Sequence, residues 1–288
     1  MIQYPGNFAP PRWDSAVITY PLALGEQHTR VLEQGAGPRA IVLVHGLGAR
    51  ADRWRRNIGP LADAGYRCVA LDLPGHGFAS KDGDFDFSVL ACARFVTDFL
   101  NELDIGRAVL VGTSLGGYIA AHIACAAPER VEAVALVGTV GIVPMGIDAR
   151  ETLGARFAGV SRDGIERKLR TVMFDDATEV TPEFVDEEWR INNGPGAHAA
   201  FAHIAKYIAE GIDDDVVGER LAALPARPPI AVIWGRDDLA IPLAVGHAAR
   251  DVLRPELYAE IPDAGHAPYF ERPEAFNALL LDFLAEGA

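Results

Sequence analysis

A short Gly-x-Ser-x-Gly stretch contains the residue best suited to covalent chemistry, Ser114. It stands between Gly112 and Gly116, after the apolar run 109–111 and before a helix-compatible segment. Glycines permit a sharp turn and a close approach of neighbouring elements, and such a turn would push the serine hydroxyl outward. The unpaired N–H groups of a helix N-terminus also favour developing negative charge. The pattern predicts a nucleophile at Ser114, provided that the chain supplies its partners.

A serine nucleophile needs a base, usually a histidine that a carboxylate orients. Among eight histidines we select His266, because the loop 262–268 directly follows a predicted strand. Asp237 and Asp238 follow another predicted strand, so either carboxylate would lie at the same edge of a parallel sheet. The resulting chain order is Ser, Asp, His. Four other histidines, at 122, 198, 203 and 247, lie in helical patterns, and His45 and His76 lie in loops where we expect structural hydrogen bonding.

A tetrahedral oxyanion needs at least two preorganised donors. We expect one from the N–H of Leu115 at the helix start and the other from the N–H of Leu47 in the loop 45–48. The same loop, with Gly46 and Gly48 ahead of Asp72, also imitates a dinucleotide-binding fingerprint. Pro74 follows Asp72 closely and allows no helical continuation there, so a nucleotide-dependent oxidoreductase is the weaker alternative.

Alternating strand and helix patterns must position these residues. We predict buried strands at 40–44, 67–71, 133–137, 229–234 and 257–261 around the strand that precedes Ser114, and helices at 54–64, 89–103, 117–127, 243–253 and from 273 onward. This alternation indicates a mostly parallel sheet with helices on both faces. Residues 139–224 carry helical signals without a convincing strand. We therefore expect an α/β core made of residues 1–138 and 225–288, with a helical cap inserted at 139–224.

Composition narrows the possible partners. The chain of 288 residues has 26 Lys and Arg against 40 Asp and Glu, a formal charge of -14 that disfavours nucleic acid and anionic membranes. Residues 1–14 lack the features of a secretory leader, and no apolar stretch is long enough to span a bilayer. Cys68, Cys92 and Cys125 show neither disulfide nor metal-site spacing. We expect a cytoplasmic protein with a small-molecule substrate and no metal; the oligomeric state stays open.

Taken together, these motifs resemble the α/β-hydrolase superfamily over nearly the whole chain. The resemblance depends on the segments 45–48, 72–77, 112–117, 235–242 and 265–266. It implies a Ser114–His266–Asp238 triad, in which the spacing to Pro242 favours Asp238 over Asp237. It also implies an intermediate held by the Leu47 and Leu115 amides, no cofactor, and a helical cap over the site. Dehalogenases and epoxide hydrolases of this fold carry Asp at the nucleophile position, so Ser114 argues against both.

Within the superfamily, Trp54-x-x-Asn57 and the size of the cap are similar to the meta-cleavage-product hydrolases. These enzymes split carbon–carbon bonds in vinylogous diketone acids. We therefore treat Trp54 and Asn57 as possible substrate-binding residues, together with Trp189 and Arg190 in the cap. Arg190 has the fork geometry to hold a carboxylate, although a surface position on its helix is the more common role.

Three hypotheses follow from the sequence. The first is a serine hydrolase of a small, partly apolar ester or lactone, because the loop 47–50 and Ala267 differ from the Gly/Ser/Pro-rich loop and the Trp common in the carbon–carbon hydrolases. The second is a carbon–carbon hydrolase of the meta-cleavage-product type. The third, from another class, is a small-molecule receptor that uses the hydrolase scaffold without turnover.

Overall fold

One mixed sheet forms the centre of the molecule in the computed structural model, which describes residues 17–81, 84–158 and 161–286. Its order is β1-β2-β4-β3-β5-β6-β7-β8. The first two strands pair antiparallel to each other, β2 pairs antiparallel to β4, and the remaining pairs are parallel. The strands are β1 (Ile18–Leu24), β2 (Gln27–Gln34), β3 (Ala40–Val44), β4 (Arg67–Leu71), β5 (Ala108–Thr113), β6 (Val131–Val137), β7 (Ile230–Gly235) and β8 (Leu257–Ile261). The α/β-hydrolase fold expected from the motifs is confirmed.

Helices cover both faces of the sheet, which explains why its central strands are unbroken apolar runs. In β3, for example, Val42 and Val44 pack into one hydrophobic cluster, whereas Ile41 and Leu43 pack into the cluster on the opposite face. The first cluster includes residues of α2 (Val89–Glu102), α3 (Leu115–Ala126) and α10 (Leu243–Leu253). The second includes residues of α1 (Ile58–Asp63) and α12 (Pro273–Glu286). Side chains of alternating direction therefore anchor the two helix layers.

The prediction of a single helix over residues 54–64 is wrong. This segment contains the short η2 (Ala51–Trp54) and a separate α1. Asn57 stands between them, and its side-chain amide donates to the Tyr269 carbonyl and to Asn277 Oδ1, both at 2.9 Å. Contacts with the distant C-terminal segment thus override the local helical pattern. The sequence also did not predict β1, an edge strand with no buried residue.

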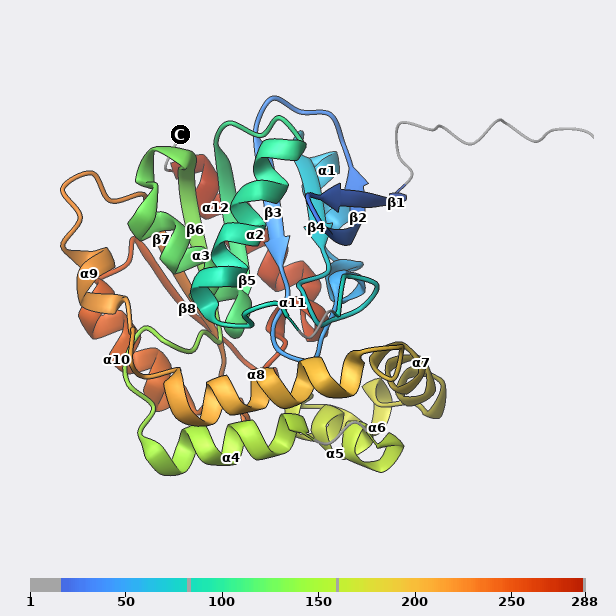
Figure 1. Cartoon of the computed structure of the whole chain (residues 1–288). Helices are drawn as coiled ribbons and strands as arrows, with labels where there is room; N and C mark the ends of the chain where they lie inside the picture. Colours follow the sequence, from blue (N-terminus) through green and yellow to red (C-terminus); the bar gives the residue numbers. More distant parts are fainter. Residues whose placement is uncertain (1–16, 82–83, 159–160, 287–288) are drawn as a thin grey trace, which may run out of the picture.

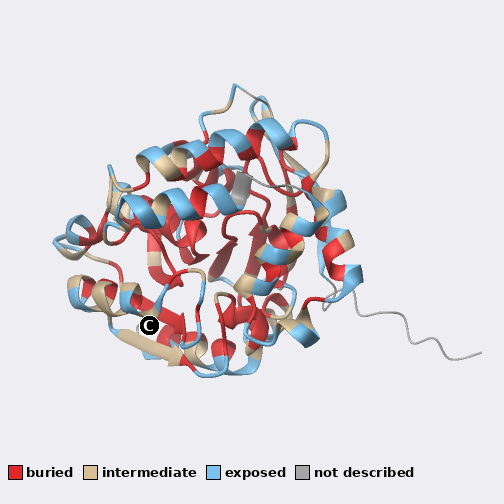
Figure 2. Cartoon of the chain, turned by 90° about the horizontal axis from the view of Figure 1, so that it is seen from below, coloured by how far each residue is buried: buried red, intermediate tan, exposed pale blue. Residues whose placement is uncertain are grey.

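Helices are the only regular elements among the described residues between β6 and β7. They are α4 (Ile147–Ala158), α5 (Arg162–Val172), α6 (Asp176–Glu179), α7 (Pro182–Asn192), α8 (Ala197–Gly211) and α9 (Gly218–Ala222). Figure 1 shows α4 to α8 as a layer below the sheet, across the ends of the central strands, with α4 packed along α8. We call α4 to α8 the cap. Seen from below, the outward faces of its helices are exposed while the strands behind them are buried (Figure 2).

All three cysteines lie within the described residues. Cys68 and Cys92 are buried, Cys125 is half-buried, and all three are free thiols. Within the described ranges, no helix combines the length and the apolar character needed to cross a membrane. The expectation about a leader falls on residues 1–14, which lie outside the described residues.

Candidate active site

Ser114 occupies a strained turn between β5 and α3. Its backbone has φ 53° and ψ −118°, a conformation that is costly for any residue other than glycine and that clusters at functional sites. A Cβ at Gly112 would lie 2.2 Å from the Gly116 carbonyl oxygen, and one at Gly116 would lie 2.3 Å from that of Val44. Both glycines are therefore required by close backbone contacts. The Ser114 side chain does not cap α3, so its hydroxyl is not committed to the helix.

His266 and Asp238 meet at the same edge of the sheet, on the loops that follow β8 and β7. His266 Nδ1 donates to Asp238 Oδ2 at 2.7 Å, and the Asp238 side chain is fully buried. The other carboxylate oxygen accepts the backbone N–H groups of Ala240 and Ile241, each at 2.8 Å. Asp237 is exposed. The geometry thus joins Asp238, not its neighbour, to His266.

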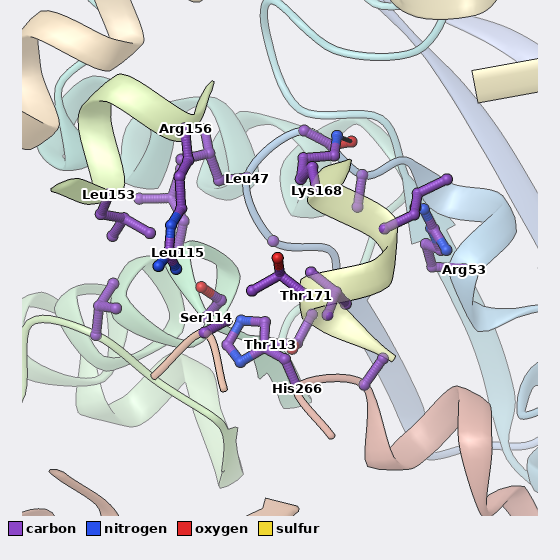
Figure 3. A pocket seen from close by; sticks show the side chains of 18 of the residues that line it. Leu47, Arg53, Thr113, Ser114, Leu115, Leu153, Arg156, Lys168, Thr171 and His266 are labelled. Carbon is purple, nitrogen blue, oxygen red and sulfur yellow. Dashed lines mark hydrogen bonds between the residues drawn. The ribbon is translucent and has the colours of Figure 1, made fainter. Parts of the chain in front are cut away.

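The environment of His266 suits a base. Burial by itself lowers the pKa of the imidazole, but the adjacent Asp238 carboxylate outweighs burial, and the net pKa lies above the ordinary value of 6.5. The bond to Asp238 places the ring proton on Nδ1, because an ionised carboxylate can only accept. Nε2 is then left to take a proton. The ring lies beside Ser114 in the pocket (Figure 3).

Two hydrogen bonds fix the orientation of the peptide group between Gly46 and Leu47, because its carbonyl oxygen accepts both of them. The Gly46 oxygen accepts His45 Nδ1–H at 2.7 Å and the N–H of Ala49 at 3.2 Å. His45 Nε2 accepts the N–H of Leu73 at 2.9 Å, so the ring is neutral, and burial lowers its pKa to about 4. In a trans peptide the N–H points away from the carbonyl. Leu47 and Leu115 both line the pocket of Ser114, as an oxyanion hole requires.

Ser114 opens into a largely apolar cavity between the core and the cap. The apolar side chains come from both parts of the molecule, with Leu47, Leu115 and Val140 on the core side and Leu153, Leu169, Val172, Ile208 and Ile212 on the cap side. Such a cavity accepts a small apolar molecule at the nucleophile.

Three cations that the sequence did not single out line this cavity, namely Arg53, Arg156 and Lys168, and none of the described lining residues is acidic. In Figure 3 the Arg156 guanidinium extends from α4 toward Ser114 and Leu115, whereas Arg53 lies farther away. Among the described side chains no carboxylate forms an ion pair with Arg156. Lys168 Nζ donates to the Gly48 carbonyl at 2.9 Å, and burial lowers its pKa to about 8. The helical pattern of the cap gave no signal of which of its arginines line the cavity.

The four additional candidates from the sequence lie outside this cavity lining. Trp54 is fully buried and its ring packs 4.0 Å from that of Tyr269, while Asn57 supports the loop of Tyr269 as described above. Trp189 and Arg190 lie on the exposed face of α7. They are not part of the site that the geometry assembles.

Glu188, the neighbour of Trp189, lies on the buried face of α7. Its buried carboxylate binds Arg50 Nη1 at 2.5 Å and Arg53 Nη2 at 3.2 Å. Burial by itself raises the pKa of Glu188, but Arg53, Arg50 and Lys168 outweigh burial and hold it below the ordinary value. We call Arg50, Arg53 and Glu188 the ion cluster. It joins the cap to the loop that carries Leu47.

The geometry of Asp72 argues against the dinucleotide interpretation. Its carboxylate accepts the backbone N–H groups of Ala51 and Phe78 and pairs with Arg30 Nε at 3.0 Å. These bonds close the loop after β4 and leave no oxygen for a ribose.

Within the described residues, no group of three or more His, Cys, Asp or Glu is arranged to hold a metal ion.

Comparison with known proteins gives two kinds of sequence relative. The chain is 35% identical over 255 residues to the dihydrolipoyllysine-residue acetyltransferase component of an acetoin cleaving system from Cupriavidus necator. That match covers 87% of this chain and 65% of the relative, so the chain spans less than two thirds of its length. The chain is also 33% identical to a 2-hydroxy-6-oxononadienedioate/2-hydroxy-6-oxononatrienedioate hydrolase from Burkholderia vietnamiensis, over 88% of this chain and 89% of that one.

Among solved structures, the 2-hydroxy-6-oxo-6-phenylhexa-2,4-dienoate hydrolase from Rhodococcus sp. strain RHA1 superposes with a TM-score of 0.83 at 25% identity. The superposition covers 94% of this chain and 99% of that structure. The family model described as the alpha/beta hydrolase fold matches residues 39–273, which include Ser114, Asp238 and His266. With this match and the sheet order above, the chain belongs to the α/β-hydrolase family of enzymes.

Proposed function

We propose that the protein is a serine hydrolase in which Ser114 is the nucleophile, His266 the general base and Asp238 the residue that orients His266. The observation that carries this proposal is the shared opening of Ser114 and His266 into the apolar cavity, with the bonded His266–Asp238 pair behind them. In this mechanism Ser114 Oγ attacks a carbonyl carbon while His266 Nε2 takes its proton. The N–H groups of Leu47 and Leu115 then stabilise the oxyanion.

For the bond cleaved, we propose a carbon–carbon bond in an acid of the 2-hydroxy-6-oxo-dienoate type. The names of the relatives from Burkholderia vietnamiensis and Rhodococcus support this substrate class, since they describe acids with a 6-oxo group. Arg156 forms no ion pair with any described carboxylate and lines the same largely apolar cavity as Lys168 and Arg53. These cations also favour a substrate that carries a carboxylate. The reaction adds water across the bond: the acyl carbon receives hydroxyl, and the leaving carbon receives the proton from His266.

A small ester or lactone is the second candidate substrate. The same nucleophile and the same donors serve ester hydrolysis, in which the proton from His266 goes to an alkoxide oxygen. The apolar lining supports this alternative, because it accepts an uncharged acyl chain equally well. The two candidates differ in their need for the cavity cations.

Turnover of both substrate classes by matched variants tests the proposal. We expect the wild-type chain to hydrolyse a ring-fission keto acid with a higher kcat/KM than short p-nitrophenyl esters, and to be labelled by a fluorophosphonate. Ser114→Ala should lose labelling and about 10⁴-fold or more in kcat, because no hydroxyl remains to form the acyl intermediate. Ser88→Ala, which removes a helix-capping serine outside the cavity lining, should retain both. A wild-type chain that neither labels nor turns over any ester or keto acid would overturn the proposal.

A further inference from the structure

The loop that carries His266 is held by a buried carboxylate that the mechanism above does not use. Glu271 is the last residue of α11 (Pro268–Glu271) and is 5% exposed. Its Oε1 accepts the backbone N–H groups of Gly265 at 2.9 Å and Ala267 at 3.3 Å. One carboxylate oxygen therefore holds the residues on both sides of His266.

The second oxygen of the same carboxylate reaches the cap. Glu271 Oε2 accepts the N–H of Phe174, just beyond α5, at 2.6 Å. Close by, the N–H of His266 itself donates to the carbonyl of Val172, the last residue of α5, at 2.7 Å. A Cβ at Gly265 would lie 2.5 Å from that carbonyl oxygen, so the cap backbone lies directly against the His266 loop.

We propose that Glu271 is the positioning residue of His266 and that it couples the placement of this base to the docking of cap helix α5. Charge-assisted bonds from N–H groups to a buried carboxylate are roughly twice as strong as neutral ones, and three of them converge here. Val172, Lys168 and Leu169 line the cavity from the same helix. Any shift of α5 is therefore transmitted to the loop of His266 by two routes, the backbone bond from His266 to Val172 and the Glu271 carboxylate.

The alternative explanation is a purely structural anchor, which would affect stability and leave the chemistry unchanged. The charge of Glu271 separates the two explanations. Asp238 and Glu271 are the acidic groups that raise the pKa of His266. Removing the Glu271 charge should lower the His266 pKa, so that the acid limb of the kcat/KM profile moves to lower pH. An anchor without influence on His266 leaves this limb in place.

The test compares Glu271→Gln with Glu271→Asp and with Glu274→Gln, which alters an exposed glutamate on the next helix. For Glu271→Gln we expect kcat to fall about 10²-fold, the loss typical of a misplaced catalytic group, with KM changed less than threefold. The acid limb should move to lower pH. Glu271→Asp keeps the charge and should recover part of kcat, and it replaces the Gln variant if that variant does not fold. Glu274→Gln should behave like the wild type.

Hydrogen–deuterium exchange gives a measurement that does not depend on activity. The amides of Phe174, Gly265 and Ala267 should exchange at least about tenfold faster in Glu271→Gln than in the wild type, because their shared acceptor is weakened. This inference rests on the proposed role of His266, and the two can fail separately. Absence of labelling and turnover in the wild type would remove the proposed function. An active wild type with unchanged kcat, acid limb and amide exchange in Glu271→Gln would overturn the role of Glu271.

Discussion

Ser114, Asp238 and His266 stand on loops at the strand ends of the core, whereas Arg156 and Lys168 reach the same cavity from cap helices. On the core side, the backbone fixes the geometry. The Asp238 carboxylate accepts two backbone N–H groups. Ser114 stands in a turn whose close backbone contacts leave room only for glycine at positions 112 and 116. On the cap side, long side chains carry the polar groups (Figure 3). Such side chains keep rotamer freedom that a backbone-held group has lost.

The comparison indicates that the core and the cap contribute different functions to the site. Groups that develop or transfer charge in the reaction need placement within a fraction of an ångström, which the core loops supply. Groups that recognise a substrate tolerate more movement. Variants on the core side should therefore act mainly on kcat, and variants on the cap side mainly on KM or on stability.

Asp238→Asn is the change that should weaken the core side most. We expect kcat to fall about 10⁴-fold, because an amide at this position no longer holds the tautomer and the charge that His266 needs. Asp237→Asn, at the exposed neighbour, is the matched control and should stay within twofold of the wild type. Steady-state kinetics on the best substrate measures both. Equal losses in the two variants would contradict the assignment of Asp238.

Among the changes on the cap side, Glu188→Gln should have the largest effect, and we expect that effect to be a loss of stability. The change leaves the buried Arg50 and Arg53 without their shared carboxylate, which we expect to lower the free energy of unfolding by about 3–5 kcal/mol. Urea denaturation measures this quantity. Glu187→Gln removes only the exposed partner of Arg50 and should cost less than about 1 kcal/mol. If Glu188→Gln folded as well as Glu187→Gln, the ion cluster would not be what holds α7 to the core.

Arg156→Gln should give the smallest effect and the most informative one for the substrate. We expect KM for a ring-fission acid to rise about tenfold, the weakening typical of one lost charge-assisted contact, while kcat changes little. KM for an uncharged p-nitrophenyl ester should not change. Arg167→Gln, an exposed residue of α5 outside the cavity lining, serves as the control. An equal rise in KM for the acid and the ester would show that Arg156 shapes the cavity without recognising a carboxylate.

The core was predictable because its pattern is local. Strands buried on both faces require continuous apolar runs, and the predicted strands 67–71 and 257–261 have the bounds of β4 and β8. The nucleophile turn has its own glycine spacing, and its candidate partners follow strands whose carboxyl ends share one edge of the sheet. The sequence alone therefore determined the fold and the loops from which the candidate site is built.

The cap residues and their partners were decided by tertiary structure. Helical periodicity marks Arg156 and Arg190 alike as polar positions, and both are exposed. Only the packing of the cap places Arg156 on the lining of the Ser114 cavity and Arg190 outside it. Glu271 carries no sequence signal either, since its partners are backbone N–H groups of residues as distant as Phe174. Every residue type except proline has the same backbone N–H, so a bond to that group does not restrict which residue stands at the donor position. The folded chain alone shows which carboxylate holds the loop of His266.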